Sequence, residues 1–432
     1  MINFGLESLP LTDQEFDSAQ AIDSSISKIT YTRDYFDNLY YKVNGPLDMC
    51  IYDPIVPLKK IAEANGLEVA ITTSSTYIQT NQKFVYTLSF SNPFKWINGK
   101  ETYNVLDDIP QYIVDSIINK NCLLLIHFAY ELGFHGDTTP LISIKKSLED
   151  KNIKLGNVIL LANTAYNFGG DLGEKYKEYV QGLNFKLITW EFFETTSKII
   201  SKELTLTLRY TDPSKLKKFV CLNRRPKLFR CVFMHKIYNR DLLKYFTMTF
   251  PKDNDIIKNA HENLDLPEVW NQIVEQDSYK EICNTLPWVY DDSSWKVLEC
   301  SPGVYEDHLI NVTFETYFGG RPDVCFLTEK TFKPIYYKMP FIIIGDPGTL
   351  TKLKNLGYKT FNDYWDESYD LTMNMEERME KICNLIENLS EMPIEMLQAI
   401  VQDMQPILDH NYNILQSSQA EAEFINALRE FV

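Results

Sequence analysis

Short apolar runs alternate with amphipathic stretches along most of the chain. A short run of Val, Ile, Leu and Phe between turn residues predicts a buried strand, and apolar residues that recur every three to four positions predict a helix. In the first half this pattern predicts strands over residues 49–52, 68–73, 122–128, 158–162 and 185–190, and helices over 56–65, 108–118, 139–151 and 173–181. Strands that alternate with helices in this way favour a parallel sheet with crossover connections.

The same alternation begins again after Pro213, whose polar neighbours are typical of a linker between domains. Strands are predicted over 218–222, within 305–314 and over 340–345, and helices over 225–238, 328–337, 348–356, 375–389 and 394–429. We therefore expect an α/β fold in which two Rossmann-like domains face a central cleft. The expected parts are 1–212 as the N-terminal domain, with 1–45 as an irregular extension, 213–405 as the C-terminal domain, and 406–432 as a C-terminal helix that returns to the N-terminal domain.

The composition, with 44% hydrophobic and 24% charged residues over 432 positions, is that of a well-packed globular protein. No apolar run approaches the roughly 20 residues that a membrane-spanning helix needs. The N-terminus has no basic segment followed by an apolar one, so we expect a cytoplasmic protein without a membrane partner. The eight cysteines include no CxxC pair, and free thiols without a zinc site are therefore expected.

The formal net charge of −16 argues against a broad electropositive surface for nucleic-acid backbones. Basic residues nevertheless concentrate between positions 215 and 236. A local basic cluster in an acidic protein suits a compact phosphate ligand, and a nucleoside diphosphate is small enough to fit this description.

The densest group of polar residues surrounds a predicted helix start at Thr328, an expected N-cap residue. Backbone amides at Glu329 and Lys330, the helix dipole and the ammonium group of Lys330 or Lys333 are predicted to hold a diphosphate without a metal ion. Glu315 and Glu329 are candidates to accept hydroxyl groups of a ribose or a sugar. The alternative for each acid is a solvated or helix-capping carboxylate.

A second anion contact is predicted where Asn223, Arg224 and Arg225 close one strand and open a helix. Ligands collect at this position in open α/β sheets. Arg224, the first choice, or Arg225 can direct two N–H donors at a β-phosphate, with Lys227 and Arg230 as supporting charges. The alternative is a surface arginine pair that serves solubility.

Phe314 and Glu315, followed by the Leu-Thr-Glu-Lys sequence at 327–330, resemble the FEN and TEK signature of the α-1,3-fucosyltransferase family. Thr316 stands where that family has Asn. The resemblance implies a GT-B fold, with these residues on a nucleoside diphosphate-sugar in a C-terminal donor domain and the acceptor in the N-terminal domain. It implies an inverting sugar transfer that needs no metal ion or other cofactor.

Wider stretches of the C-terminal half resemble glycosyltransferase-like proteins of tailed phages. These stretches are 219–230, 326–335, 340–345 and 356–361. This resemblance implies a modified DNA base as acceptor and the host cytoplasm as location. The residues themselves leave three acceptors open, namely a hydroxymethylated DNA base, a glycan and a protein side chain.

An inverting transferase also needs a base that takes the proton of the acceptor hydroxyl. The polar loop after the strand predicted at 122–128 contains Glu131, the first choice, and His135, the second. The alternative, equally weighted, is that Glu131 is a surface acid and that His127 is a satisfied core histidine.

Three interpretations compete with a metal-independent enzyme. Asp253-Asn-Asp255 has the DxD form of metal-dependent glycosyltransferases, but it opens a helical stretch, which favours a capping role. A catalytically silent protein of the same fold, binding a nucleotide-sugar, a glycan or a nucleic acid, is the main alternative function; an α/β structural protein of a virion is a further one.

Overall fold

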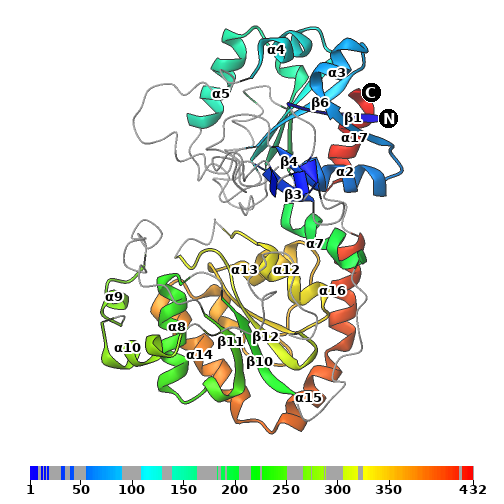
Figure 1. Ribbon diagram of the computed structural model, residues 1–432. Helices are drawn as coiled ribbons and strands as arrows, with labels where there is room; N and C mark the ends of the chain where they lie inside the picture. Colours follow the sequence, from blue (N-terminus) through cyan, green and yellow to red (C-terminus); the bar gives the residue numbers. More distant parts are fainter. Residues whose placement is uncertain are drawn as a thin grey trace. The chain divides into compact units, whose positions relative to one another are not determined.

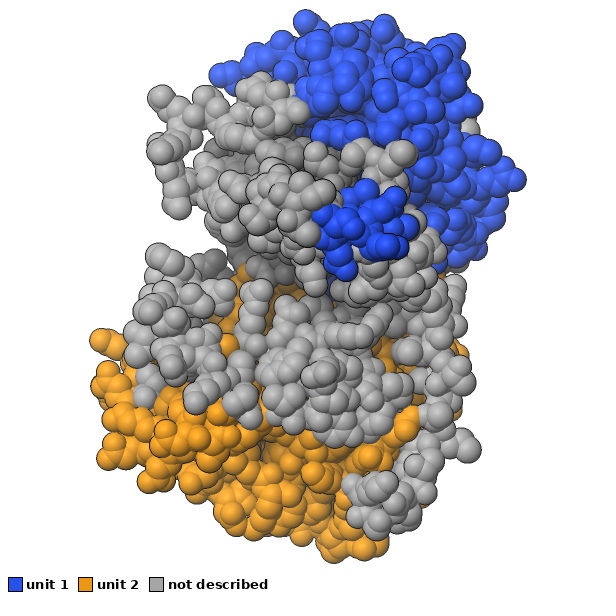
Figure 2. Space-filling model, in the orientation of Figure 1, with its two compact units in different colours: residues 1–195, 419–432 blue, residues 196–418 orange. Residues whose placement is uncertain are grey.

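The chain forms two compact units in a computed structural model (Figure 2). Unit 1 comprises residues 1–195 and 419–432, and unit 2 comprises residues 196–418. The structure describes all residues except 8–10, 13, 16, 19–30, 35–38, 43–54, 90–108, 129–138, 163–181, 183–185, 190–191, 204–215, 224–225, 251–265, 274, 287, 289–304, 320–324, 418–420 and 432.

Unit 1 is built around a six-stranded parallel sheet (Figure 1). Its strands, in spatial order, are β5 (Val69–Thr73), β1 (Ile2–Leu6), β6 (Phe84–Ser89), β7 (Cys122–Phe128), β8 (Val158–Ala162) and β9 (Lys186–Thr189). Its helices include α2 (Ile55–Ala64), α3 (Ser74–Gln79), α4 (Gln111–Ile118) and α5 (Thr139–Asp150), with the short turn η2 (Leu155–Asn157). Leu124, Leu125 and Ile126 of β7 are each 0% exposed, because a parallel sheet covered on both faces buries successive side chains.

Unit 2 contains a four-stranded parallel sheet. Its order is β11 (Phe246–Thr249), β10 (Lys217–Leu222), β12 (His308–Phe314) and β13 (Phe341–Ile344). The helices and turns along this part of the chain are α8 (Leu228–Asn239), η3 (Leu243–Tyr245), α9 (Val269–Ile273), α10 (Asp277–Asn284), α12 (Glu329–Tyr336), α13 (Thr349–Asn355) and η6 (Ser368–Leu371). These two parallel sheets confirm the predicted α/β class.

The prediction of an irregular extension over residues 1–45 is wrong. Residues 2–6 form β1, which lies between β5 and β6, and β2 (Leu11–Thr12), β4 (Leu39–Lys42) and β3 (Tyr31–Asp34) form a small antiparallel sheet. Because β1 is only five residues long and includes Asn3 and Gly5, its hydrophobic pattern is weak. Its neighbours in the sheet stabilise it as a strand.

The predicted helix over 394–429 is in fact three helices, α15 (Ile394–Asp403), α16 (Gln405–Ser417) and α17 (Ala422–Phe431), after α14 (Met375–Glu391). Pro406 explains the first break, because proline has no N–H and is tolerated only at the start of a helix. In unit 2, α8 packs against α14 and α12 against α16 (Figure 1).

Residues 419–432 belong to unit 1, whereas 406–418 stay in unit 2. The Lys83 Nζ donates to the Phe431 carbonyl at 2.8 Å, and Lys186 pairs with Glu430 at 3.0 Å. The division between the units comes after residue 195, whereas the sequence predicted it at 212/213. It falls inside α7 (Phe192–Glu203), and most of this helix belongs to unit 2. Among the described residues, no helix is long and apolar enough to cross a membrane.

Candidate functional site

The candidate site lies where the winding of the unit 2 sheet changes direction. The chain runs from β10 to β11 on one side and then crosses to β12 on the other side of β10. In open α/β sheets, ligands bind beyond the carboxyl ends of the two strands that flank such a point. Asn223 directly follows β10 and Glu315 directly follows β12, so the fold brings two of the predicted site segments to this position.

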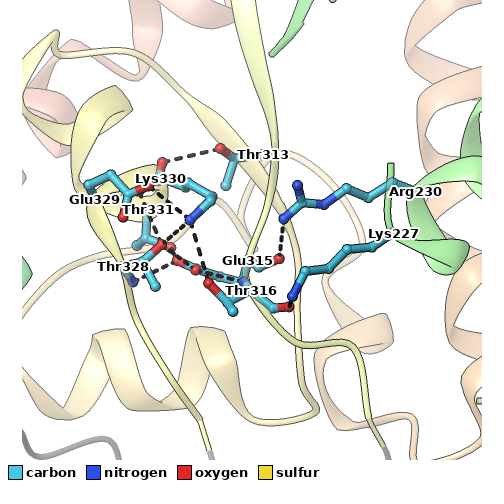
Figure 3. A network of polar contacts seen from close by, with 9 residues as sticks. All are labelled: Lys227, Arg230, Thr313, Glu315, Thr316, Thr328, Glu329, Lys330 and Thr331. Atoms are coloured by element: carbon cyan, nitrogen blue, oxygen red, sulfur yellow. Dashed lines mark hydrogen bonds and ion pairs between the residues drawn. The ribbon is translucent and has the colours of Figure 1, made fainter. Parts of the chain in front are cut away.

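Glu315 ties the end of β12 to the start of α12 (Figure 3). Its Oε1 accepts the Thr328 N–H at 3.0 Å and a hydroxyl hydrogen bond from Thr331. Its Oε2 accepts the Thr328 hydroxyl at 2.6 Å and the Thr316 N–H at 3.2 Å. The residue is 1% exposed, so the carboxylate is buried and each oxygen has two donors from the chain itself.

This arrangement corrects the role predicted for Glu315. A carboxylate accepts about four hydrogen bonds, and the four observed here fill that capacity. Glu315 therefore positions the segment that begins at Thr328 and has no acceptor site left for a ligand hydroxyl.

The start of α12 is capped by its own side chains. Thr328 has extended backbone angles, and its Oγ1 accepts the Lys330 N–H at 3.3 Å, as expected of an N-cap residue. The Thr331 N–H donates to the Thr328 carbonyl at 3.1 Å. The Lys330 amide that was predicted to bind phosphate is thus already satisfied, and a ligand here would have to displace the Thr328 hydroxyl.

Lys330 extends its ammonium group over this helix start (Figure 3). Its Nζ lies 2.9 Å from Glu329 Oε1, 3.0 Å from Thr328 Oγ1 and 3.5 Å from Thr316 Oγ1. The Lys330 side chain is 29% exposed, so solvent reaches the cation. The predicted cation at the helix start is present and accessible.

Glu329 is buried beside two cations. Burial raises the pKa of its carboxyl group, but the charges of Lys330 and Lys333 together with hydrogen bonds from Lys330 and the Glu329 backbone outweigh burial and hold the pKa below its ordinary value. Glu329 is therefore ionised at neutral pH and fixes the Lys330 ammonium group.

Lys227 and Arg230 approach the end of β12 from the segment that follows β10 (Figure 3). The Lys227 Nζ donates to the Thr316 carbonyl at 3.0 Å and lies 5.2 Å from the centre of the Tyr317 ring. The Arg230 Nη2 donates to the Glu315 carbonyl at 3.0 Å. Arg230 is 4% exposed, and burial lowers its pKa to about 10, so this buried guanidinium remains charged at neutral pH.

The cluster carries an excess of positive charge. Its four cations and two carboxylates leave a local charge of 4 − 2 = +2 in a chain whose formal net charge is −16; the members are Lys227, Arg230, Lys330, Lys333, Glu315 and Glu329. Arg230 interacts electrostatically with both carboxylates, and Lys333 with Glu329.

Two further predicted site residues are buried. Phe314 is 2% exposed and packs edge-on against Phe233, with ring centres 5.1 Å apart, so it belongs to the core and not to a ligand surface. The Asn223 N–H donates to Thr249, and its Oδ1 has no hydrogen-bond partner in the described part of the chain. Such an unsatisfied buried acceptor is uncommon. Asn223 Oδ1 is therefore a candidate to accept a hydrogen bond from a ligand.

Sequence reasoning missed the residues that hold Gly319, which follows β12. Asp346 Oδ1 accepts the Gly319 N–H at 2.5 Å, and Arg378 of α14 donates to the Gly319 carbonyl. The Arg378 guanidinium also lies 4.2 Å from the centre of the Phe318 ring. In the sequence, the signal for such a role is an arginine on the apolar face of an amphipathic helix. The partner of that arginine becomes known only from the fold.

Four predicted site residues lie outside the described residues: Arg224, Arg225, Glu131 and His135. The same is true of Asp253 and Asp255. His127, at the end of β7, is 1% exposed, and burial lowers its pKa to about 3, so it is neutral at physiological pH. Within the described ranges, no group of three or more His, Cys, Asp or Glu side chains is arranged to hold a metal ion.

Comparisons of the chain with models of known protein families, with curated proteins and with solved structures found no match.

Proposed function

We propose that this chain is an inverting glycosyltransferase of the GT-B type. It transfers a sugar from a nucleoside diphosphate-sugar to an acceptor hydroxyl, and Lys and Arg side chains replace a metal ion. The observation that supports this proposal most is the excess positive charge around Lys330 at the carboxyl ends of β10 and β12. The resemblance of 314–315 and 327–330 to the α-1,3-fucosyltransferase signature points to the same ligand.

The chemistry needs charge stabilisation of the leaving diphosphate. As the glycosidic bond breaks, negative charge builds up on the diphosphate oxygens, and fixed cations stabilise it without reorganisation. Lys330 Nζ is paired with the Glu329 carboxylate at 2.9 Å and also contacts the Thr328 and Thr316 hydroxyls, and Lys227 Nζ donates to a backbone carbonyl. A phosphate can replace the hydroxyl and carbonyl contacts while Glu329 keeps Lys330 in place. The buried Arg230 and Lys333 add a constant positive potential.

Lys330→Ala tests this assignment directly. A charged hydrogen bond is worth about 1.5–3 kcal/mol, so donor affinity measured by calorimetry should fall roughly 10- to 150-fold. The capping bond to Thr328 Oγ1 comes from the Lys330 backbone N–H, and the Glu315 contacts come from Thr316, Thr328 and Thr331, so these bonds remain in Lys330→Ala and the fold should be retained. Lys244→Ala is the matched control, because Lys244 lies just before β11, at the amino end of the same sheet.

Turnover is measured as release of nucleoside diphosphate from a panel of nucleotide-sugars, with EDTA present. Wild-type release from at least one donor, lost in Lys330→Ala and kept in Lys244→Ala, is the expected result. Unchanged donor affinity in Lys330→Ala would reject the site. Donor binding without any release would instead support the catalytically silent binding protein.

A further inference from the structure

We propose that Glu7 is the general base that takes the proton from the acceptor hydroxyl. This inference depends on the proposed function and adds a described residue to the candidates Glu131 and His135. Two observations support this inference. Glu7 directly follows β1 of the unit 1 sheet, and the Tyr86 hydroxyl donates a hydrogen bond to its carboxylate.

Glu7 directly follows β1, which lies at the point where the winding of the unit 1 sheet changes direction. The chain runs from β1 to β5 on one side and then crosses to β6 on the other side. Gly5 of β1 is paired with Tyr86 of β6, so Glu7 emerges at the shared carboxyl ends of these two strands. A ligand of unit 1 is expected at this place, for the same reason as in unit 2.

A buried hydroxyl holds the Glu7 carboxylate in place. The Tyr86 hydroxyl donates to Glu7 Oε1 at 2.5 Å, and Tyr86 is 0% exposed. Burial and the charge of Glu7 raise the pKa of Tyr86 well above its ordinary value, so the hydroxyl keeps its proton and remains the donor. The Ser74 hydroxyl donates to the carbonyl of Leu6 at 3.3 Å and anchors the backbone next to Glu7.

Glu7 itself is only half-buried, unlike Tyr86 beneath it. Tyr112, in the first turn of α4, is 43% exposed and close enough for the Glu7 charge, together with burial, to raise its pKa. A base that is oriented by a second group and still reaches solvent has the arrangement found in general acid–base catalysis. Glu315, by contrast, is fully buried and has four chain donors.

The step balances without a further reactant. The acceptor oxygen forms a bond to the anomeric carbon while the Glu7 carboxylate takes the hydroxyl proton. The bond between the anomeric carbon and the diphosphate oxygen breaks, and its electron pair leaves with the diphosphate as the leaving group.

Glu7→Gln is the first test, because glutamine keeps the size of the side chain and can still accept from Tyr86. The expected loss of kcat is about 10²- to 10⁴-fold, while donor affinity in calorimetry stays unchanged. Glu68→Gln removes the same charge from an exposed residue just before β5, at the opposite end of the sheet, and should leave kcat unchanged. The rate is measured with each of two added acceptors, a duplex oligonucleotide that contains 5-hydroxymethylcytosine and N-acetyllactosamine. It is also measured without an added acceptor, when water is the only one present.

Two more variants separate a catalytic role from a structural one. Sodium formate should restore part of the rate of Glu7→Ala, because a small carboxylate can take the proton in the vacated space; a structural role gives no response to formate. Tyr86→Phe keeps the carboxylate but removes the hydroxyl that orients it, so kcat should fall less than in Glu7→Gln, with donor affinity retained.

The outcomes distinguish the two proposals. If the wild type releases nucleoside diphosphate and Glu7→Gln matches its kcat, the proposed function stands and the role of Glu7 is overturned. A Glu7→Ala variant that is inactive and does not respond to formate also overturns it. If the wild type cleaves no donor, the proposed function fails and the role of Glu7 fails with it.

Discussion

At the scale of single residues, burial separates carboxylates that hold the structure from those that can react. Glu315 is 1% exposed and accepts four hydrogen bonds from Thr316, Thr328 and Thr331. Glu7 is half-buried and accepts a hydrogen bond from the Tyr86 hydroxyl. A saturated buried carboxylate cannot exchange protons with a substrate, so similar side chains at similar strand ends serve different purposes.

Glu315→Ala should destabilise unit 2 by roughly 3 kcal/mol, because buried donors of Thr328 and Thr331 lose their acceptor. Urea unfolding gives the loss, and hydrogen exchange over residues 325–336 locates it. Thr331→Val, which removes one of these donors, should cost about 1 kcal/mol. Equal losses for the two variants would contradict the central role of the carboxylate.

At the scale of elements, β1 shows how packing on both sides stabilises a weakly patterned segment. Phe4 and Leu6 are 0% exposed, and Ile2 is 1% exposed. A side-chain Cβ at Gly5 would lie 2.6 Å from Phe84 Cδ2 and 2.6 Å from Ser74 Oγ. Glycine therefore fits best where β1 passes the Phe84 ring of β6 and Ser74 at the start of α3.

Gly5→Ala should destabilise unit 1 by about 1–3 kcal/mol, the usual cost of overpacking. The reduced urea midpoint should come with faster hydrogen exchange in β1 and β6. Gly156→Ala is the control, since a Cβ added there would meet nothing within 4 Å and its cost should be near zero. A Gly5→Ala protein as stable as the control would mean that β1 can shift without loss.

At the scale of the whole molecule, both units use the same winding: the first strand of each sheet lies between the second and the third. Each unit thus has its own position for a ligand at the carboxyl ends of two strands. The chain does not simply pass from one unit to the next, because α17 returns to unit 1 and buries Phe424, Ile425 and Leu428 there. Unit 1 therefore depends on both ends of the sequence.

Removal of residues 419–432 should selectively weaken unit 1. Three fully buried apolar side chains contribute roughly 5–9 kcal/mol as an upper estimate, which is comparable to the stability of a whole domain. Hydrogen exchange should accelerate in β6 and β7, whereas β12 and β13 serve as the internal reference in unit 2. Unchanged protection of β6 and β7 would contradict the dependence of unit 1 on α17.

Several of the long elements follow from the sequence alone, although β6 and α7 were not predicted. The strands at 122–128 and 158–162 have the predicted bounds, and the helix start at Thr328 is where the N-cap pattern placed it. These features depend on apolar runs and caps within a few neighbouring residues, so local free energies determine them. Of the basic cluster predicted at 215–236, Lys227 and Arg230 reach the end of β12, whereas Lys218 and Lys236 contact other parts of unit 2.

Other features were decided only by the tertiary structure. The register of β1, the saturation of Glu315 and the contact between Glu7 and Tyr86 join residues up to 79 positions apart. The sequence shows only that Glu7 and Glu315 are both glutamates. It does not show that Glu315 is buried among hydrogen-bond donors while Glu7 is half-exposed. Burial and hydrogen-bond partners depend on which strands become neighbours, and long-range packing alone sets that order.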